Sequence, residues 1–237
     1  MKPILFNTEM VKAILDGRKT VTRRLPSSRI RDKWYEYDEW ATDQCAGMAA
    51  AGIRCERSYE DDFYRNRQPY EEGEVLYVRE TWKQATGGTA GPGLYDTYLY
   101  KADEPQDTSG LMVEERWHPS IHMPKAAARI FLRVTEVRLE RLREISEDDA
   151  LKEGCTGEPC HCLKEGRGIY GCTDCMNTGW IEPPELDFMY LWEKTVPKDL
   201  KHICGWDANP WVWVIGFERI SREEVANAEA EFHTKGL

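Results

Sequence analysis

The sequence predicts an α+β protein, a small mixed β-barrel with flanking short helices, from three observations. The runs that alternate apolar and polar residues in the manner of strands are short, as at Glu74–Glu80. Segments with a helical spacing of apolar residues are few and short. The last apolar run, Trp211–Ile220, is apolar on both faces, which is typical of a central strand covered on two sides.

The first expected element is a helix over residues 8–16. Its apolar residues stand at positions 10, 11, 14 and 15, so that they share one face. Asn7 or Thr8 can cap the start of this helix, and Gly17 can end it. The polar segment that follows Gly17 therefore leaves the end of a short helix.

Later segments are expected to alternate between strands, loops and short helices. Alternating apolar residues predict a long strand over residues 130–142, and the Gly- and Thr-rich stretch 84–93 predicts a mobile loop. Ser146 and Asp149 form a capping-box-like start for a short helix that ends at Glu153. A second helix is expected over Glu185–Lys194.

The charge of the chain is acidic overall and basic in one place. The formal net charge is −10, whereas a protein that coats a nucleic-acid duplex normally carries the opposite sign over much of its surface. The segment from Arg18 to Lys33 is locally basic. It suits one phosphate, one carbonyl or a short strand, and the alternative interpretation is a solvated basic turn.

Five of the eight cysteines lie between positions 155 and 175, a crowding typical of a metal site in a reducing compartment. Two close pairs separated by a short loop can close a tetrahedral site, for which zinc is the expected metal. Four protein ligands leave no open position, so a structural ion is expected. Cys155 or His161 remains an alternative for one ligand. The predicted ligands are Cys160, Cys162, Cys172 and Cys175.

The chain of 237 residues, 41% of them hydrophobic, is long enough for one good core. We therefore expect a single domain over residues 1–237, with an irregular insertion at 25–70 and a zinc-binding insertion at 155–182. The start does not resemble a signal peptide, and no run approaches the roughly 20 apolar residues that a membrane span needs. A soluble, cytoplasmic protein is the expectation.

The pattern Gly17-x-Lys19-x-x-x-x-Arg24 resembles the signature of the ASCH family, whose members have a PUA-like barrel. The helix before it, Gly73–Val78 after it and the last strand occur in the order that this family shows. The start of the chain, Val78–Trp82 and Ile121–Val134 are similar to the long ASCH proteins of phages and prophages. The resemblance implies a PUA-like barrel, and for this subgroup it implies no particular activity.

Three further positions are similar to the N4-acetylcytidine amidohydrolases, a smaller branch of the ASCH family. A lysine and a threonine within Gly-Arg-Lys-Thr-x-Thr, and a glutamate at the end of the helix after the long strand, fall on Lys19, Thr22 and Glu153. The resemblance implies that these three residues are catalytic. A solvated turn, and for Glu153 an exposed glutamate on a short helix, are the alternatives.

Such a trio has the groups that amide hydrolysis needs. Thr22 can supply the nucleophilic hydroxyl, and Lys19 can act as its base if desolvation lowers its pKa. Glu153 can orient the lysine or bind the cytosine edge, and Arg24 or Arg79 can stabilise the oxyanion. Alternatively, Lys19 or Glu153 activates a water that Thr22 positions. Residues three apart in a regular strand point to opposite faces, so cooperation of Lys19 and Thr22 requires a turn or bulge.

The remaining substrate-binding candidates are Arg18, Arg24, Arg79 and Trp82, where the tryptophan either stacks on a base or belongs to the core. The first functional hypothesis is a base-recognising amidohydrolase for an acylated cytidine or similar modified nucleoside. The second is a non-catalytic module that binds short single-stranded RNA or DNA. The third is a phage accessory protein whose zinc insertion contacts a protein partner.

Overall fold

The structure is a computed structural model that describes residues 1–31, 33, 50, 67–87, 96–105, 108–109, 111–166, 169 and 172–235. The insertion expected at 25–70 lies mostly outside the described residues. The chain divides into two compact units, each assembled from separate segments. Unit one comprises residues 1–20, 72–135 and 217–237, and unit two comprises residues 21–71 and 136–216.

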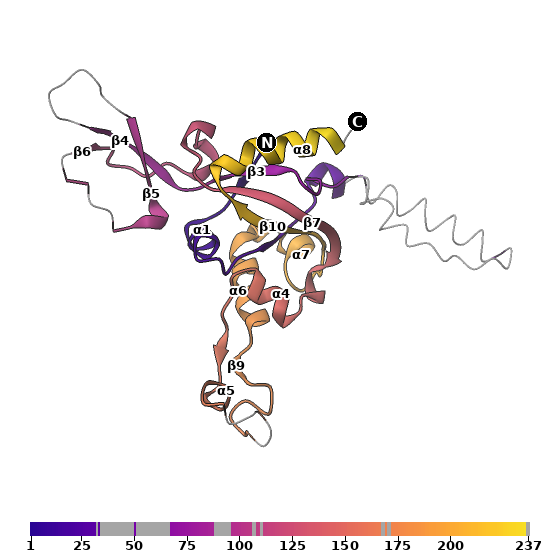
Figure 1. The fold of residues 1–237 in the computed structure, drawn as a ribbon. Coiled ribbons are helices and arrows are strands. Elements are labelled where there is room, and N and C mark those ends of the chain that lie inside the picture. The colour runs from indigo at the N-terminus through magenta and orange to yellow at the C-terminus, as the bar shows by residue number, and fades with distance from the viewer. Residues whose placement is uncertain are drawn as a thin grey trace. The chain divides into compact units, whose positions relative to one another are not determined.

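Unit one contains two groups of strands with short helices (Figure 1). Strand β1 pairs in parallel with β3, and β3 pairs antiparallel with β7, where Leu76 lies opposite Leu132. A second sheet has the order β5-β4-β6. The elements are β1 (Lys2–Leu5), α1 (Thr8–Leu15), β3 (Val75–Arg79), β4 (Trp82–Gly87), β5 (Asp96–Tyr100), η1 (Lys101–Asp103), β6 (Leu111–Val113), η2 (Ser120–His122), η3 (Lys125–Ala127), the start of β7 (Phe131–Arg141), the end of β10 (Trp211–Ile220) and α8 (Arg222–Lys235).

Unit two contains strand β2, the remainder of β7 and β10, and most of the described short helices. Strand β2 pairs antiparallel with β10, and Thr22 lies opposite Ile215. Strands β8 and β9 form a separate two-stranded ribbon. The elements are β2 (Val21–Arg24), η4 (Leu142–Glu144), α4 (Glu147–Lys152), β8 (Glu158–Pro159), α5 (His161–Lys164), β9 (Trp180–Glu182), α6 (Pro184–Thr195), η5 (Lys198–Leu200) and α7 (Lys201–Cys204).

Each unit has a core of its own. In unit one, Val75 and Phe131 from the sheet pack with Met123 and with residues from α8. In unit two, Val212 and Val214 of β10 pack with Phe188 and Trp192 of α6. Strand β10 is buried at six consecutive positions, Val212–Phe217, so the sequence prediction of a strand covered on both faces is confirmed.

The predicted α+β class is confirmed, and among the described residues the strands form open sheets and no closed barrel. The prediction of a loop over residues 84–93 is wrong for its first part, because β4 continues to Gly87. Cross-strand pairing of Ala85 with Thr97 and with Val113 outweighs the loop-like composition. In the described part of the chain, no helix has the length and apolar character needed to cross a membrane.

Helix α1 has the boundaries that its sequence predicts. The side chain of Asn7 accepts a hydrogen bond of 2.8 Å from the backbone N–H of Met10, so one free N–H of the first turn is satisfied. Gly17 has φ +76°, a left-handed conformation that glycine adopts without steric cost and that ends the helix.

Replacing Asn7 with alanine removes the cap of α1. We expect Asn7→Ala to lower the free energy of unfolding by about 1 kcal/mol, measured by denaturant unfolding. Lys12→Gln on the exposed face of the same helix is the control and should change stability by less than about 0.5 kcal/mol. Equal effects of the two substitutions would contradict the capping role.

Candidate functional site

Lys19 is a buried residue of unit one, with an exposed fraction of only 1%. The end of α1 turns the chain at Gly17, and the backbone N–H groups of Arg18 and Lys19 both donate to the carbonyl of Ala13, at 2.9 and 3.0 Å. The Lys19 ammonium lies 5.9 Å from the centre of the Phe6 ring. Lys19 precedes strand β2, which begins at Val21. The rule that side chains three apart in a strand point to opposite faces therefore does not apply to Lys19 and Thr22.

Lys19 also lines a pocket of about 320 Å³ in unit one. This volume is at the low end of the range for ligand pockets. Its wall combines the end of α1 with the part of β10 that follows Gly216. The lining residues are Ile14, Leu15, Asp16, Gly17, Lys19, Thr20, Phe217 and Arg219.

Thr22 and Arg24 belong to β2 in unit two. Thr22 is 2% exposed. Successive side chains of a strand point to opposite faces, so the Arg23 side chain lies on the other face of β2 from Thr22. Arg24 is partly buried, and this burial lowers the pKa of its guanidinium, whereas the negative charge of Glu153 acts to raise it. Arg24 therefore interacts electrostatically with Glu153 within unit two.

Arg23 forms the most buried ion cluster among the described residues of unit two. Its side chain has no exposed surface and donates to Glu140 at 3.0 Å and to Asp149 at 2.9 Å. A longer contact of 3.5 Å joins it to Glu153. Arg138 donates to the same Asp149 oxygen at 2.9 Å. A guanidinium withdrawn from water needs such partners, because an unpaired buried charge is very costly.

Glu153 is the C-terminal cap of α4 and is 3% exposed. The helix starts where the sequence predicts, because the Ser146 side chain accepts from the backbone N–H of Asp149. A carboxylate at a helix C-terminus faces the negative end of the helix dipole. Arg23 supplies the positive charge that offsets this unfavourable placement.

The other predicted substrate-binding residues differ in exposure. Arg18 is exposed and pairs with Asp16 at 2.9 Å. Arg79 donates through Nε to the carbonyl of Met123 at 2.8 Å. Trp82 is 9% exposed and packs in the core of unit one, with the rings of Tyr98 and His118 at 5.6 and 5.0 Å. Its packing matches the core alternative for this tryptophan.

The ion-pair partners of Arg23 were not predicted from the sequence. The signal for them is the alternation of Glu136, Arg138 and Glu140, which places three charges on one face of strand β7. The sequence indicated Asp149 only as part of a helix cap, but Asp149 is also an ion-pair partner of Arg23. The same pattern of alternating charges is typical of a solvent-facing strand, so by itself it does not reveal the buried Arg23 that pairs with Glu140.

Four cysteines converge in the knot formed by β8, α5, β9 and the turn between them. The sulfur atoms of Cys160, Cys162, Cys172 and Cys175 all lie within 4.8 Å of one another, so they can hold a metal ion. Three of the four residues are buried and Cys172 is partly exposed. The backbone N–H of Gly179 donates to the Cys175 sulfur at 3.3 Å.

The two alternative ligands differ in their distance from the four-cysteine cluster. Cys155 packs in the core of unit two with Val21 and Phe188 and is not part of the cluster of thiols. His161 is exposed beside the cluster, with its Nδ1 3.5 Å from the sulfur of Cys160. Four cysteines therefore suffice for a tetrahedral set without either residue.

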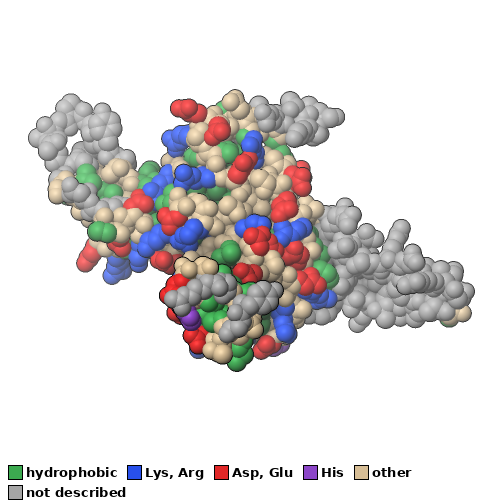
Figure 2. Space-filling view, turned by 60° about the horizontal axis from the view of Figure 1, so that its bottom comes forward, with side chains coloured by type: hydrophobic (Ala, Val, Ile, Leu, Met, Phe, Trp, Pro, Cys, Tyr) green, Lys and Arg blue, Asp and Glu red, His purple; other side chains and the backbone are tan. Residues whose placement is uncertain are grey.

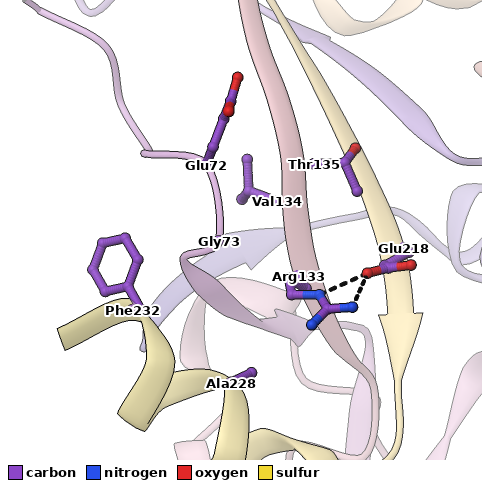
Figure 3. A pocket seen from close by; sticks show the side chains of 8 residues that line it. All are labelled: Glu72, Gly73, Arg133, Val134, Thr135, Glu218, Ala228 and Phe232. Atoms are coloured by element: carbon purple, nitrogen blue, oxygen red, sulfur yellow. Dashed lines mark hydrogen bonds and ion pairs between the residues drawn. The ribbon is translucent and has the colours of Figure 1, made fainter. Parts of the chain in front are cut away.

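A further pocket of unit one has a volume of about 340 Å³, and Figure 3 shows the side chains that line it. Arg133 and Glu218 form an ion pair there. The predicted site residues are not among those that line this pocket. On the face presented by Figure 2, basic and acidic side chains are interspersed, without a large area of one sign.

Comparisons with known proteins add no relative: no family model matches the chain, and neither the curated proteins nor the solved structures provide a match.

Loss of the Arg23 guanidinium should destabilise the protein strongly. We expect Arg23→Met to lower the free energy of unfolding by about 3–5 kcal/mol, because Glu140, Asp149 and Glu153 would lose their shared partner. Denaturant unfolding measures this change.

The matched control is Arg18→Met, which breaks an exposed ion pair and should cost less than about 1 kcal/mol. If both substitutions had the same small effect, the buried cluster would contribute no more than a surface pair.

Proposed function

We propose that this chain is an ASCH-type protein with a PUA-like fold that binds a modified nucleoside and hydrolyses the amide of an N4-acylated cytidine or a similar base. The observation that carries the proposal is the burial of three polar residues. Lys19, Thr22 and Glu153, which the family resemblance marks as catalytic, are 1%, 2% and 3% exposed.

Burial of polar side chains is costly unless they are paired, and such groups concentrate at functional sites. A solvated turn would leave Lys19 in water, and an exposed glutamate would leave Glu153 in water. The burial of both residues argues against these two alternatives. Lys19 precedes Thr22 by three residues, so the chain itself keeps their Cα atoms within about 11 Å.

The proposed reaction transfers an acyl group to water. The Thr22 hydroxyl, or a water that it positions, attacks the acyl carbon while Lys19 accepts the proton. The bond between the acyl carbon and N4 breaks, and Lys19 returns the proton to N4 so that the free amino group of cytosine leaves. Where Thr22 is the nucleophile, a water then hydrolyses the acyl-threonine ester, which releases the carboxylic acid and restores the hydroxyl. Arg24 carries positive charge close to Glu153 and is suited to stabilise the oxyanion.

A non-catalytic module that binds short single-stranded RNA or DNA is the alternative function. Buried ion pairs such as those of Arg23 also occur for structural reasons alone. The net charge of −10 and the mixed charges in Figure 2 favour a small substrate over a long polymer. A phage accessory protein with a protein partner is the third possibility from the sequence.

The proposal includes a structural zinc ion at Cys160, Cys162, Cys172 and Cys175. A zinc–sulfur bond of about 2.3 Å in a tetrahedral site implies sulfur–sulfur distances of about 3.8 Å. The distances from Cys160 to Cys172 and from Cys162 to Cys175 are 3.7 and 3.6 Å, close to this value. A metal site built from cysteine thiolates is typical of a reducing compartment such as the cytoplasm.

Turnover of N4-acetylcytidine tests the proposed activity. We expect the wild-type protein to release acetate and cytidine. Lys19→Met, Thr22→Val and Glu153→Gln, each close in size to the native residue, should lower kcat/KM by about 10²–10⁴-fold. Liquid chromatography of the two nucleosides measures the reaction.

Lys12→Met, on the exposed face of α1, is the control and should retain full activity. Circular dichroism and the melting temperature establish that each variant is folded. A folded wild-type protein without turnover would refute the hydrolase function, and salt-dependent binding of short single strands in its place would support the alternative.

Zinc should be required for the fold of the knot. We expect about one tightly bound zinc ion per chain at the four cysteines, and Cys162→Ser should release it and expose the knot to proteolysis. Cys155→Ser, outside the cluster, should retain the ion. Elemental analysis after dialysis measures the zinc content of each variant. Retention of the metal by Cys162→Ser would contradict the assignment.

A further inference from the structure

The outer side of the cysteine knot carries a second group of metal-binding side chains that the four-thiol centre does not use. His161 and Asp174 have exposed side-chain fractions of 51% and 59%. The His161 Nδ1 lies 3.4 Å from a carboxylate oxygen of Asp174. These two atoms and the sulfur of Cys172 all lie within 4.8 Å of one another.

The charges at this position favour a cation. Four thiolates around one divalent ion have a net charge of −2, and the carboxylate of Asp174 adds another negative charge beside them. Sulfur, imidazole nitrogen and carboxylate oxygen all offer electron pairs there. A positive charge placed among them would be attracted by every one of these groups.

We propose that the knot binds a second divalent metal ion, of the borderline-soft class that includes zinc, between His161, Asp174 and Cys172. The thiolate of Cys172 would be shared by the two ions. This inference rests on occupancy of the four-thiol centre, and it is independent of the proposed hydrolase activity. Three protein ligands leave the fourth coordination position to solvent.

The distances agree with this assignment. Zinc binds imidazole nitrogen and carboxylate oxygen at about 2.0–2.2 Å, which in a tetrahedral site separates the two ligand atoms by about 3.3–3.5 Å. The 3.4 Å between His161 and Asp174 lies in this range. Cys172 is the partly exposed cysteine of the four, so its sulfur is the one best placed to contact an ion on the outer side.

The two ions should differ in how readily they exchange. The four-thiol ion has a closed set of ligands, three of them from buried residues, whereas the second ion has exposed ligands and one open position. A chelator should therefore remove the second ion rapidly and the first ion slowly. Such an open ion is suited to exchange with solvent or to bind a further ligand.

Zinc stoichiometry and release kinetics of the full chain test the proposal. The metal-free, reduced protein is titrated with zinc, and release to a chromophoric chelator is followed by absorbance. The wild type should bind two equivalents and release one in a fast phase and one in a slow phase. His161→Ala and Asp174→Asn should each lose the fast equivalent and keep the slow one.

Glu182→Gln, an exposed acid on β9 of the same knot, is the matched control and should keep both equivalents. Cys172→Ser should lose the fast equivalent and accelerate release of the slow one, because its thiolate serves both ions. Retention of the slow equivalent shows that each variant knot is folded.

Several results would overturn the inference. A wild-type stoichiometry of one equivalent would mean that His161 holds a proton or a hydrogen bond in place of a metal. A fast phase that survives both His161→Ala and Asp174→Asn would place the second ion elsewhere. If the wild type bound no zinc, both the four-thiol zinc site and the second site would be refuted. The hydrolase proposal would still stand or fall on turnover of N4-acetylcytidine alone.

Discussion

The buried guanidinium of Arg23 is the interaction on which the candidate site in unit two depends. It joins β2 to Glu140 of β7 and to Asp149 and Glu153 around α4. Because its side chain has no contact with water, these carboxylates must remain near it. Glu153 is thereby held beside the strand that carries Thr22, although 130 residues separate it from Arg23 in the chain.

The cysteine knot follows a different physical rule from the rest of unit two. The core there depends on apolar residues such as Trp192 and Val214, together with Cys155. Among the described residues of the knot, the buried cluster consists of three cysteines with Ile169 and Cys172 packed against it, so the proposed metal ion would be its main source of stability. Strand β8 of the knot begins at Glu158, five residues after the Glu153 cap of α4.

Features with local signals could be predicted from the sequence. Helices α1 and α4 were predicted from their caps, β10 from its apolar run, and the thiol cluster from its spacing. The Arg23 cluster was not predicted, because its ion pairs join residues more than 100 positions apart. Residues 84–87 of β4 were mistaken for a loop, because the stability of this strand comes from pairing with β5 and β6.

A double-mutant cycle between Arg23 and Glu153 tests most directly whether the guanidinium holds this carboxylate. The free energy of unfolding is measured for the wild type, Arg23→Met, Glu153→Gln and the double variant. We expect a coupling energy of about 1–3 kcal/mol, because the two side chains are in contact at 3.5 Å within a buried ion cluster. Additive effects, within about 0.3 kcal/mol, would show that Arg23 does not hold Glu153 in place.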